Sequence, residues 1–154
     1  MRCVLLVLLL PALAASNALA QEYSVADLAA AFDRSVVVIA ANQHACYSFE
    51  VFIAVSETQK LRGLMHVREL PQDYGMLFIY GDTAMHSMWM KNTYIPLDIL
   101  FIRDDGTVAS IARHTEPLSL RSIRSTEPVK YVLELNAGVT ERLAIDAGSV
   151  MVVQ

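Results

Sequence analysis

Five residues in the middle of this 154-residue sequence have the chemistry of a small-molecule binding site. They are two cations, an amide, a carboxyl and an aromatic ring: Arg62, Lys91, Asn92, Asp98 and Trp89. Two cations beside an amide and an aromatic ring suit a small anionic or sugar-like ligand. The sequence therefore predicts a binding or accessory domain without enzymatic activity, and it does not indicate a cofactor.

Asp98 allows more than one interpretation. It lies in the segment 95–102, which is apolar on both faces of a predicted strand, so we expect its carboxyl to be buried. A buried carboxyl needs a hydrogen-bonding or charged partner. The nearest candidate partners are Lys91, Asn92, Thr93 and Arg62. Asp98 then serves as the floor of a ligand pocket, as part of a structural ion pair, or as the general base of a hydrolase-type enzyme.

A methionine-rich segment suggests a metal site as an alternative function. On a strand, His86, Met88 and Met90 would share one face, with neighbours along that face about 6.5–7 Å apart. Thioether sulfur and imidazole nitrogen are donors that suit Cu(I), which exported proteins encounter. The structural alternative is that these methionines fill an irregular core.

Sequence motifs of several large protein classes do not occur in this chain. It contains no His-Glu-x-x-His, Gly-x-Ser-x-Gly, Cys-x-x-Cys, Gly-x-Gly-x-x-Gly or P-loop pattern. Zincin, α/β-hydrolase, thioredoxin-like and nucleotide-binding functions therefore lack the motif that would carry them.

Short alternating and apolar segments predict a mostly β fold around these candidate residues. Strands are expected at 36–41, 46–55, 75–80, 85–91, 95–102, 108–111, 129–135 and 150–153. A short capped helix or a mobile arm is expected at 24–32, and short helices are expected from Ser56 to between 61 and 65 and at 136–145. On the strand 129–135 we expect Lys130, Val132 and Glu134 to form the polar face of a half-buried strand. The fold class is α+β, mostly β: a compact antiparallel barrel-like or sandwich-like sheet with two or three short helices.

The first twenty residues read as a cleavable export signal. Met1-Arg2 precedes an apolar run from Cys3 to Ala15, and Ala18-Leu19-Ala20 forms an A-x-A cleavage site before Gln21. We expect a periplasmic or secreted mature protein with no stable membrane span. Cleavage leaves Cys46 as the single cysteine, so no intramolecular disulfide can form.

Charge argues against a nucleic-acid partner. The formal net charge is −4, and it becomes −5 after the signal is removed, because that removal takes away Arg2 and no acidic residue. No run of Lys or Arg is present, and binding to phosphates needs clustered positive charge. We therefore expect a small-molecule ligand rather than DNA or RNA.

Several short motifs together resemble the DUF192 (UPF0127) family of small exported bacterial and archaeal proteins. The matching segments are Arg62-Gly63-Leu64-Met65, Leu70-Pro71, Gly75-Met76-Leu77-Phe78, Trp89-Met90-Lys91-Asn92-Thr93, Ile95-Pro96-Leu97-Asp98, Leu100-Phe101-Ile102, Pro117 with Ser119, and Tyr131-Val132-Leu133-Glu134-Leu135 with Ala137-Gly138. The resemblance spans about residues 45–153.

The resemblance implies a compact, mainly β domain with Trp89–Thr93 as its signature segment. It adds Ser119 to the candidate ligand-binding residues. The expected organisation is a signal peptide at 1–20, an N-terminal arm and first strand at 21–44, and a DUF192-like domain at 45–154. The family is named for lacking an assigned function, so the resemblance implies fold and compartment rather than chemistry.

Overall fold

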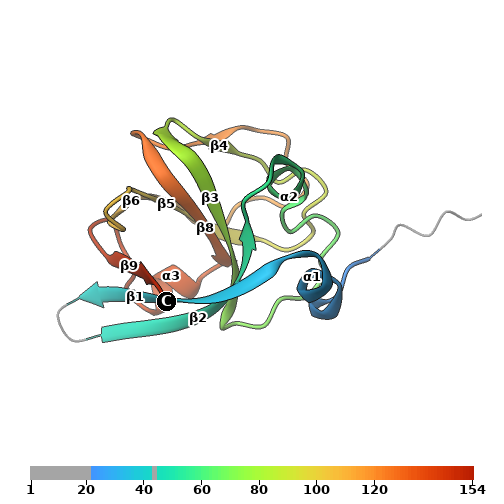
Figure 1. The fold of residues 1–154 in the computed structure, drawn as a ribbon, viewed down its shortest axis with the longest axis horizontal. Helices are drawn as coiled ribbons and strands as arrows, with labels where there is room; N and C mark the ends of the chain where they lie inside the picture. Colours follow the sequence, from blue (N-terminus) through green and yellow to red (C-terminus); the bar gives the residue numbers. More distant parts are fainter. Residues whose placement is uncertain (1–21, 43–44) are drawn as a thin grey trace, which may run out of the picture.

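The computed structural model describes residues 22–42 and 45–154, so the predicted export signal at 1–20 lies outside the described residues. Within them the chain forms three short helices and nine strands (Figure 1). The helices are α1 (Val25–Ala31), α2 (Glu57–Arg62) and α3 (Val139–Arg142). The strands are β1 (Asp33–Asn42), β2 (Ala45–Ala54), β3 (Tyr74–Ala84), β4 (Ser87–Met88), β5 (Leu97–Ile102), β6 (Val108–Ala112), β7 (Ile123–Arg124), β8 (Val129–Asn136) and β9 (Val150–Val153). No helix in this part of the chain is both long enough and apolar enough to cross a membrane.

Seven of the strands form one curled sheet in the order β6-β5-β8-β3-β2-β1-β9. Neighbouring strands are antiparallel except β2 and β3, which are parallel because α2 crosses between them. The curl brings the two edges of the sheet together, where the amide of Met151 donates to the carbonyl of Gly106 and that of Val108 to the carbonyl of Ser149. The result is a half-barrel, with β4 and β7 as a separate small sheet.

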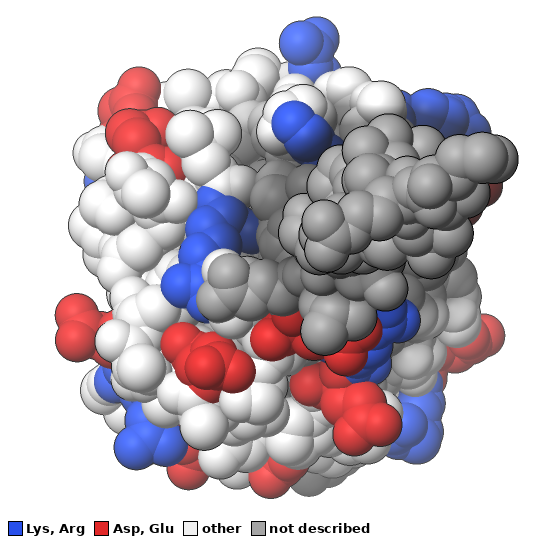
Figure 2. Space-filling view, turned by 90° about the vertical axis from the view of Figure 1, so that its right-hand side faces the viewer, with Lys and Arg blue, Asp and Glu red and all other residues white. Residues whose placement is uncertain are grey.

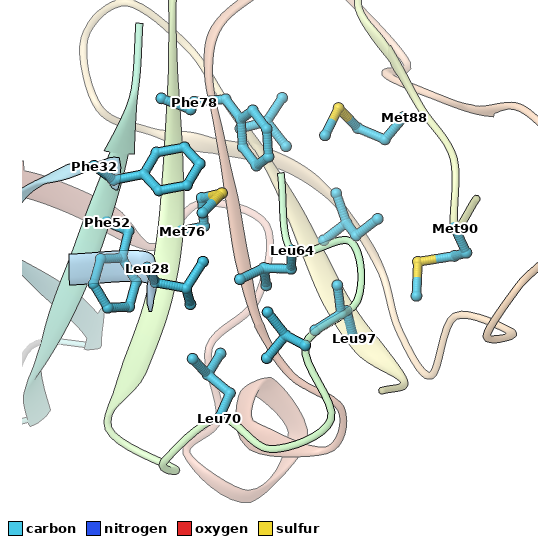
Figure 3. Packing of buried hydrophobic residues seen from close by; sticks show 14 of the residues in the cluster. Leu28, Phe32, Phe52, Leu64, Leu70, Met76, Phe78, Met88, Met90 and Leu97 are labelled. Atoms are coloured by element: carbon cyan, nitrogen blue, oxygen red, sulfur yellow. The ribbon is translucent and has the colours of Figure 1, made fainter. Parts of the chain in front are cut away.

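Each face of the sheet carries its own hydrophobic core. The first cluster lies under α1 and α2 and includes Phe32, Phe52, Met76, Phe78 and Leu97 (Figure 3). The second cluster lies on the other face and is covered by α3, which contributes Val139. The central strands are therefore buried on both sides, and this includes Glu134 of β8.

The predicted fold class is confirmed, with three local differences. The expected strand 85–91 is reduced to the two residues of β4, because Met90 donates its amide to the carbonyl of Ser119 in an irregular loop. The expected helix 136–145 is reduced to α3, and β7 was not predicted. A two-residue strand such as β7 carries too short a pattern to show a period.

Candidate functional site

A small cavity lies between α2, β3, β4 and β8. Its volume is about 80 Å³, which is room for a few water molecules or one small polar group. Side chains of both charge types and of apolar character line it: Lys60, Leu61, Arg62, Gly63, Leu64, Met65, Phe78, Tyr80, Ser87, Met88, Trp89, Thr93 and Glu134.

The two cations of the cavity wall are placed there by α2. This helix begins with a capping box, in which the Ser56 hydroxyl accepts from the Gln59 amide at 3.2 Å and the Gln59 side chain accepts from the Ser56 amide at 3.0 Å. It ends at Gly63, whose φ of +48° is a conformation that favours glycine. A Cβ at Gly63 would also lie 3.3 Å from the ring of Phe78. The chain can therefore turn back tightly over β3 and keep α2 against the sheet.

Lys60 is largely covered, with a side chain only 11% exposed. Its Nζ lies 3.0 Å from Oε1 of the exposed Glu57 and 4.8 Å from the ring centroid of Tyr80. Burial raises the pKa of the Tyr80 hydroxyl to about 12, and this hydroxyl donates to the sulfur of Met88 at 3.6 Å. Lys60 thus supplies positive charge over a neutral aromatic ring.

Arg62 is held between aromatic rings of the N-terminal arm. Its Cζ lies 4.2 Å from the ring centroid of Tyr23 and 5.2 Å from that of Phe32. Its Nε and Nη2 are buried and have no hydrogen-bond partner among the residues that the structure describes. The guanidinium is therefore fixed in place by stacking while two of its donors stay unused.

Glu134 is the most unusual group of the site. It lies in the centre of the sheet on β8, opposite Met76 of β3 and Ile99 of β5, and is 4% exposed. No hydrogen bond within the described part of the chain reaches its carboxyl group, and burial raises its pKa to about 8. Below that pH the carboxyl is mainly neutral, so it can donate a hydrogen bond as well as accept one.

The burial of Glu134 corrects the prediction for this strand. The expectation that Lys130, Val132 and Glu134 form the polar face is wrong at Val132 and Glu134, because the first hydrophobic cluster covers that face of β8. The signal that was available is Val132, an apolar residue two positions earlier on the same face. Lys60 and Tyr80 were likewise not singled out, since neither belongs to a motif.

Comparison with known proteins places the chain in a family. A family model, DUF192, described as "Uncharacterized ACR, COG1430", matches residues 37–153. The chain belongs to the DUF192 family. Among functionally curated proteins, none matches this chain.

Two solved structures show the same fold in bacterial relatives. A protein of Sinorhizobium meliloti 1021, described as a candidate transcription regulator, is 42% identical over 79% of this chain and 95% of its own, with a TM-score of 0.78. A protein of unknown function from Novosphingobium aromaticivorans DSM 12444 is 29% identical over 88% of this chain and 94% of its own, with a TM-score of 0.77.

The predicted ligand-binding residues lie partly in the cavity and partly elsewhere in the fold. Arg62 and Trp89 line the cavity, whereas the exposed Lys91 does not, and its Nζ lies 5.1 Å from the ring centroid of Trp89. Asn92 has a φ of +55°, and its side-chain amide lies 3.9 Å from the sulfur of Met65. Ser119 lines a separate hollow, and its hydroxyl accepts from the amide of Arg121 at 3.4 Å.

Asp98 is buried as predicted, but its expected partners are wrong. Its Oδ1 accepts from the amide of His114 at 3.0 Å, and its Oδ2 accepts from both the amide and the hydroxyl of Thr140, at 3.0 and 2.7 Å. It does not line the cavity. Asp98 joins β5 to α3 rather than meeting Arg62 or Lys91. Because it is sealed from solvent, this geometry argues against a general-base role.

Of the three residues of the predicted copper site, only Met88 lies in a strand, because β4 spans Ser87–Met88. His86 stacks on Tyr80 with ring centroids 3.5 Å apart, and Met88 contacts the hydroxyl of the same tyrosine. Met90 is fully buried and accepts from the Thr115 hydroxyl at 3.2 Å (Figure 3). Among the described residues, no group of three or more His, Cys, Asp or Glu side chains is arranged to hold a metal ion. Only Met88 of the three lines the cavity.

Proposed function

We propose that this DUF192 protein is a binding domain for a small organic anion, whose acidic group enters the cavity between α2 and β8. The observation that carries this proposal is Glu134. A carboxyl group that is 4% exposed and has no hydrogen bond within the described residues needs a partner in the cavity, which water or a ligand can supply. It faces a cavity, which gives such a ligand a place.

The charges around the cavity favour an anion over a cation. Lys60 and Arg62 contribute two positive charges to the wall, while Glu134 is mainly neutral below about pH 8. A carboxylate can accept the proton of the Glu134 carboxyl in a charge-assisted hydrogen bond, with the cations balancing its charge. A metal ion or an ammonium group would meet two like charges there instead.

Export is part of the proposal. The apolar run of Cys3 to Ala15 and the Ala18-Leu19-Ala20 site support a mature chain that begins at Gln21 and acts in the periplasm or outside the cell. The mass of the protein recovered from a periplasmic extract tests it. A mass that retains residues 1–20 would contradict cleavage.

Transcription regulation, the role in the description of the Sinorhizobium relative, is not what we propose for this chain. Its net charge is −4, and it has no run of basic residues. On the face shown in Figure 2, basic and acidic side chains are interspersed rather than gathered in one basic patch. A surface of this kind is poorly suited to a phosphate backbone.

Titration of the chain with acetate, followed by amide NMR, tests the proposed function. We expect shifts for residues 60–65, and weaker binding when the cavity cation is removed in Lys60→Met or the carboxyl in Glu134→Leu. Lys130→Met is the matched control, because Lys130 does not line the cavity and bonds the carbonyl of Gly81 instead. The absence of shifts in the unmodified chain, or equal weakening by Lys130→Met, would overturn the proposal.

A further inference from the structure

Two exposed apolar side chains flank the cavity. Leu61 of α2 is 63% exposed and Trp89 is 42% exposed, and both line the cavity. An isolated exposed leucine needs no explanation, but an apolar pair beside a buried polar group is an arrangement typical of ligand sites.

The cavity is large enough for only one part of a larger ligand. About 80 Å³ holds a carboxylate-sized group and little more, so the remainder of any larger ligand must lie outside the cavity. Leu61 stands on α2 and Trp89 directly follows β4. The part of the ligand outside the cavity would therefore lie against apolar surface.

We propose that the ligand is an amphiphilic monocarboxylate, with its acidic group inside the cavity and an aliphatic or aromatic tail on Leu61 and Trp89. This inference rests on the proposed function and adds its ligand class. The tail gains free energy by removing Leu61 and the indole from water. The positive charge of Lys91 next to Trp89 adds attraction for the anion at the rim.

Other anions fit these features less well. Inorganic phosphate or sulfate has no apolar part to cover Leu61 and Trp89. A sugar acid would place hydroxyl groups against the exposed leucine, where they lose water without gaining a partner. We therefore expect fatty and aromatic acids to bind more tightly than polar acids, because only their tails gain from contact with Leu61.

A series of acetate, butanoate, hexanoate and octanoate tests the ligand class. Trp89 is the single tryptophan of the chain, so intrinsic fluorescence reports on the rim of the cavity directly. We expect the affinity to rise about two- to fourfold for each added methylene group while the tail still contacts the rim. In Leu61→Ser the rise should become shallower, so that octanoate loses more affinity than acetate does.

Leu120→Ser is the matched control, because Leu120 is 71% exposed but does not line the cavity. It should leave the whole series unchanged. Equal affinities for acetate and octanoate would overturn this inference and leave the proposed function standing. Failure of every carboxylate to bind would overturn both. If hexan-1-ol bound as tightly as hexanoate, the ligand would not need an acidic group, and both proposals would be overturned.

Discussion

At the scale of single residues, Glu134 carries most of the chemistry of the site. It has the same apolar neighbours as a core residue, and yet it keeps an ionisable group at the cavity wall. Lys60 and Arg62 of α2 line the same cavity, so one carboxyl and two cations contribute to its wall. Arg62 and Trp89 could be predicted from the sequence. Glu134 could not, because its burial depends on the strands beside β8.

The pKa of Glu134 makes stability depend on pH. Its pKa is about 8 in the folded chain and near 4.5 when exposed. The folded state therefore keeps a proton that the unfolded state releases, and stability falls as the pH rises from about 4.5 to about 8. The slope from this group is about 1.4 kcal/mol for each pH unit.

Replacing the ionisable group should remove this dependence. We expect Glu134→Gln to flatten the fall in unfolding free energy between pH 4.5 and 8, measured by urea denaturation at several pH values. Glu50→Gln is the control, because Glu50 is exposed on β2 and should leave the profile unchanged. An unaltered slope in Glu134→Gln would show that another group titrates.

At the scale of elements, Asp98 is the connection between β5 and α3. It accepts three hydrogen bonds, two from backbone amides and one from the Thr140 hydroxyl. A helix of four residues has little stability of its own, so this connection holds it against the sheet. The sequence predicted a buried carboxyl here, but the partners lie 16 and 42 residues further along the chain.

Removal of the Asp98 carboxyl should therefore destabilise the fold strongly. We expect Asp98→Ala to lower the unfolding free energy by about 3 kcal/mol or more, because buried donors lose their acceptor. Thr140→Val removes the bond that this hydroxyl donates to Asp98 and the one that it accepts from Nε of Arg113, and should cost about 1–2 kcal/mol. Equal losses from the two substitutions, measured by chemical denaturation, would contradict this role.

The capping box of α2 positions the cations of the site. We expect Ser56→Ala to cost about 1 kcal/mol of stability, because the Gln59 amide loses its acceptor. Anion affinity should fall with it, since Lys60 and Arg62 lie in the same helix. Thr58→Ala is the control, as Thr58 is exposed and has no capping role. An unchanged melting temperature for Ser56→Ala would count against the role of the cap.

At the scale of the whole molecule, the half-barrel depends on the close approach of its two edges. Gly106 has a φ of +84°, and a Cβ there would lie 2.3 Å from the carbonyl oxygen of Met151. The Asp105-Gly106 turn connects β5 and β6, which pair with each other. Its contact with β9 was not predicted, because it joins residues far apart in the sequence.

Gly106→Ala should separate these edges. We expect a loss of about 2 kcal/mol or more, because the backbone strain and the clash with Met151 act together. Gly81→Ala is the matched control, since no atom lies within 4 Å of a Cβ at that position. Thermal unfolding of both variants distinguishes them. Equal melting temperatures would contradict the importance of this contact.

The sequence by itself determined the mostly β class, most of the strands, the capped helix α2 and the burial of Asp98. These features follow from local patterns of apolar residues, capping residues and turns, which act over a few positions. Only the tertiary structure decided that β8 is a central strand, that Asp98 bonds α3, and that Glu134 lines the same cavity as Lys60 and Arg62. These depend on which strands become neighbours, because burial on a sheet is set by the elements covering each face.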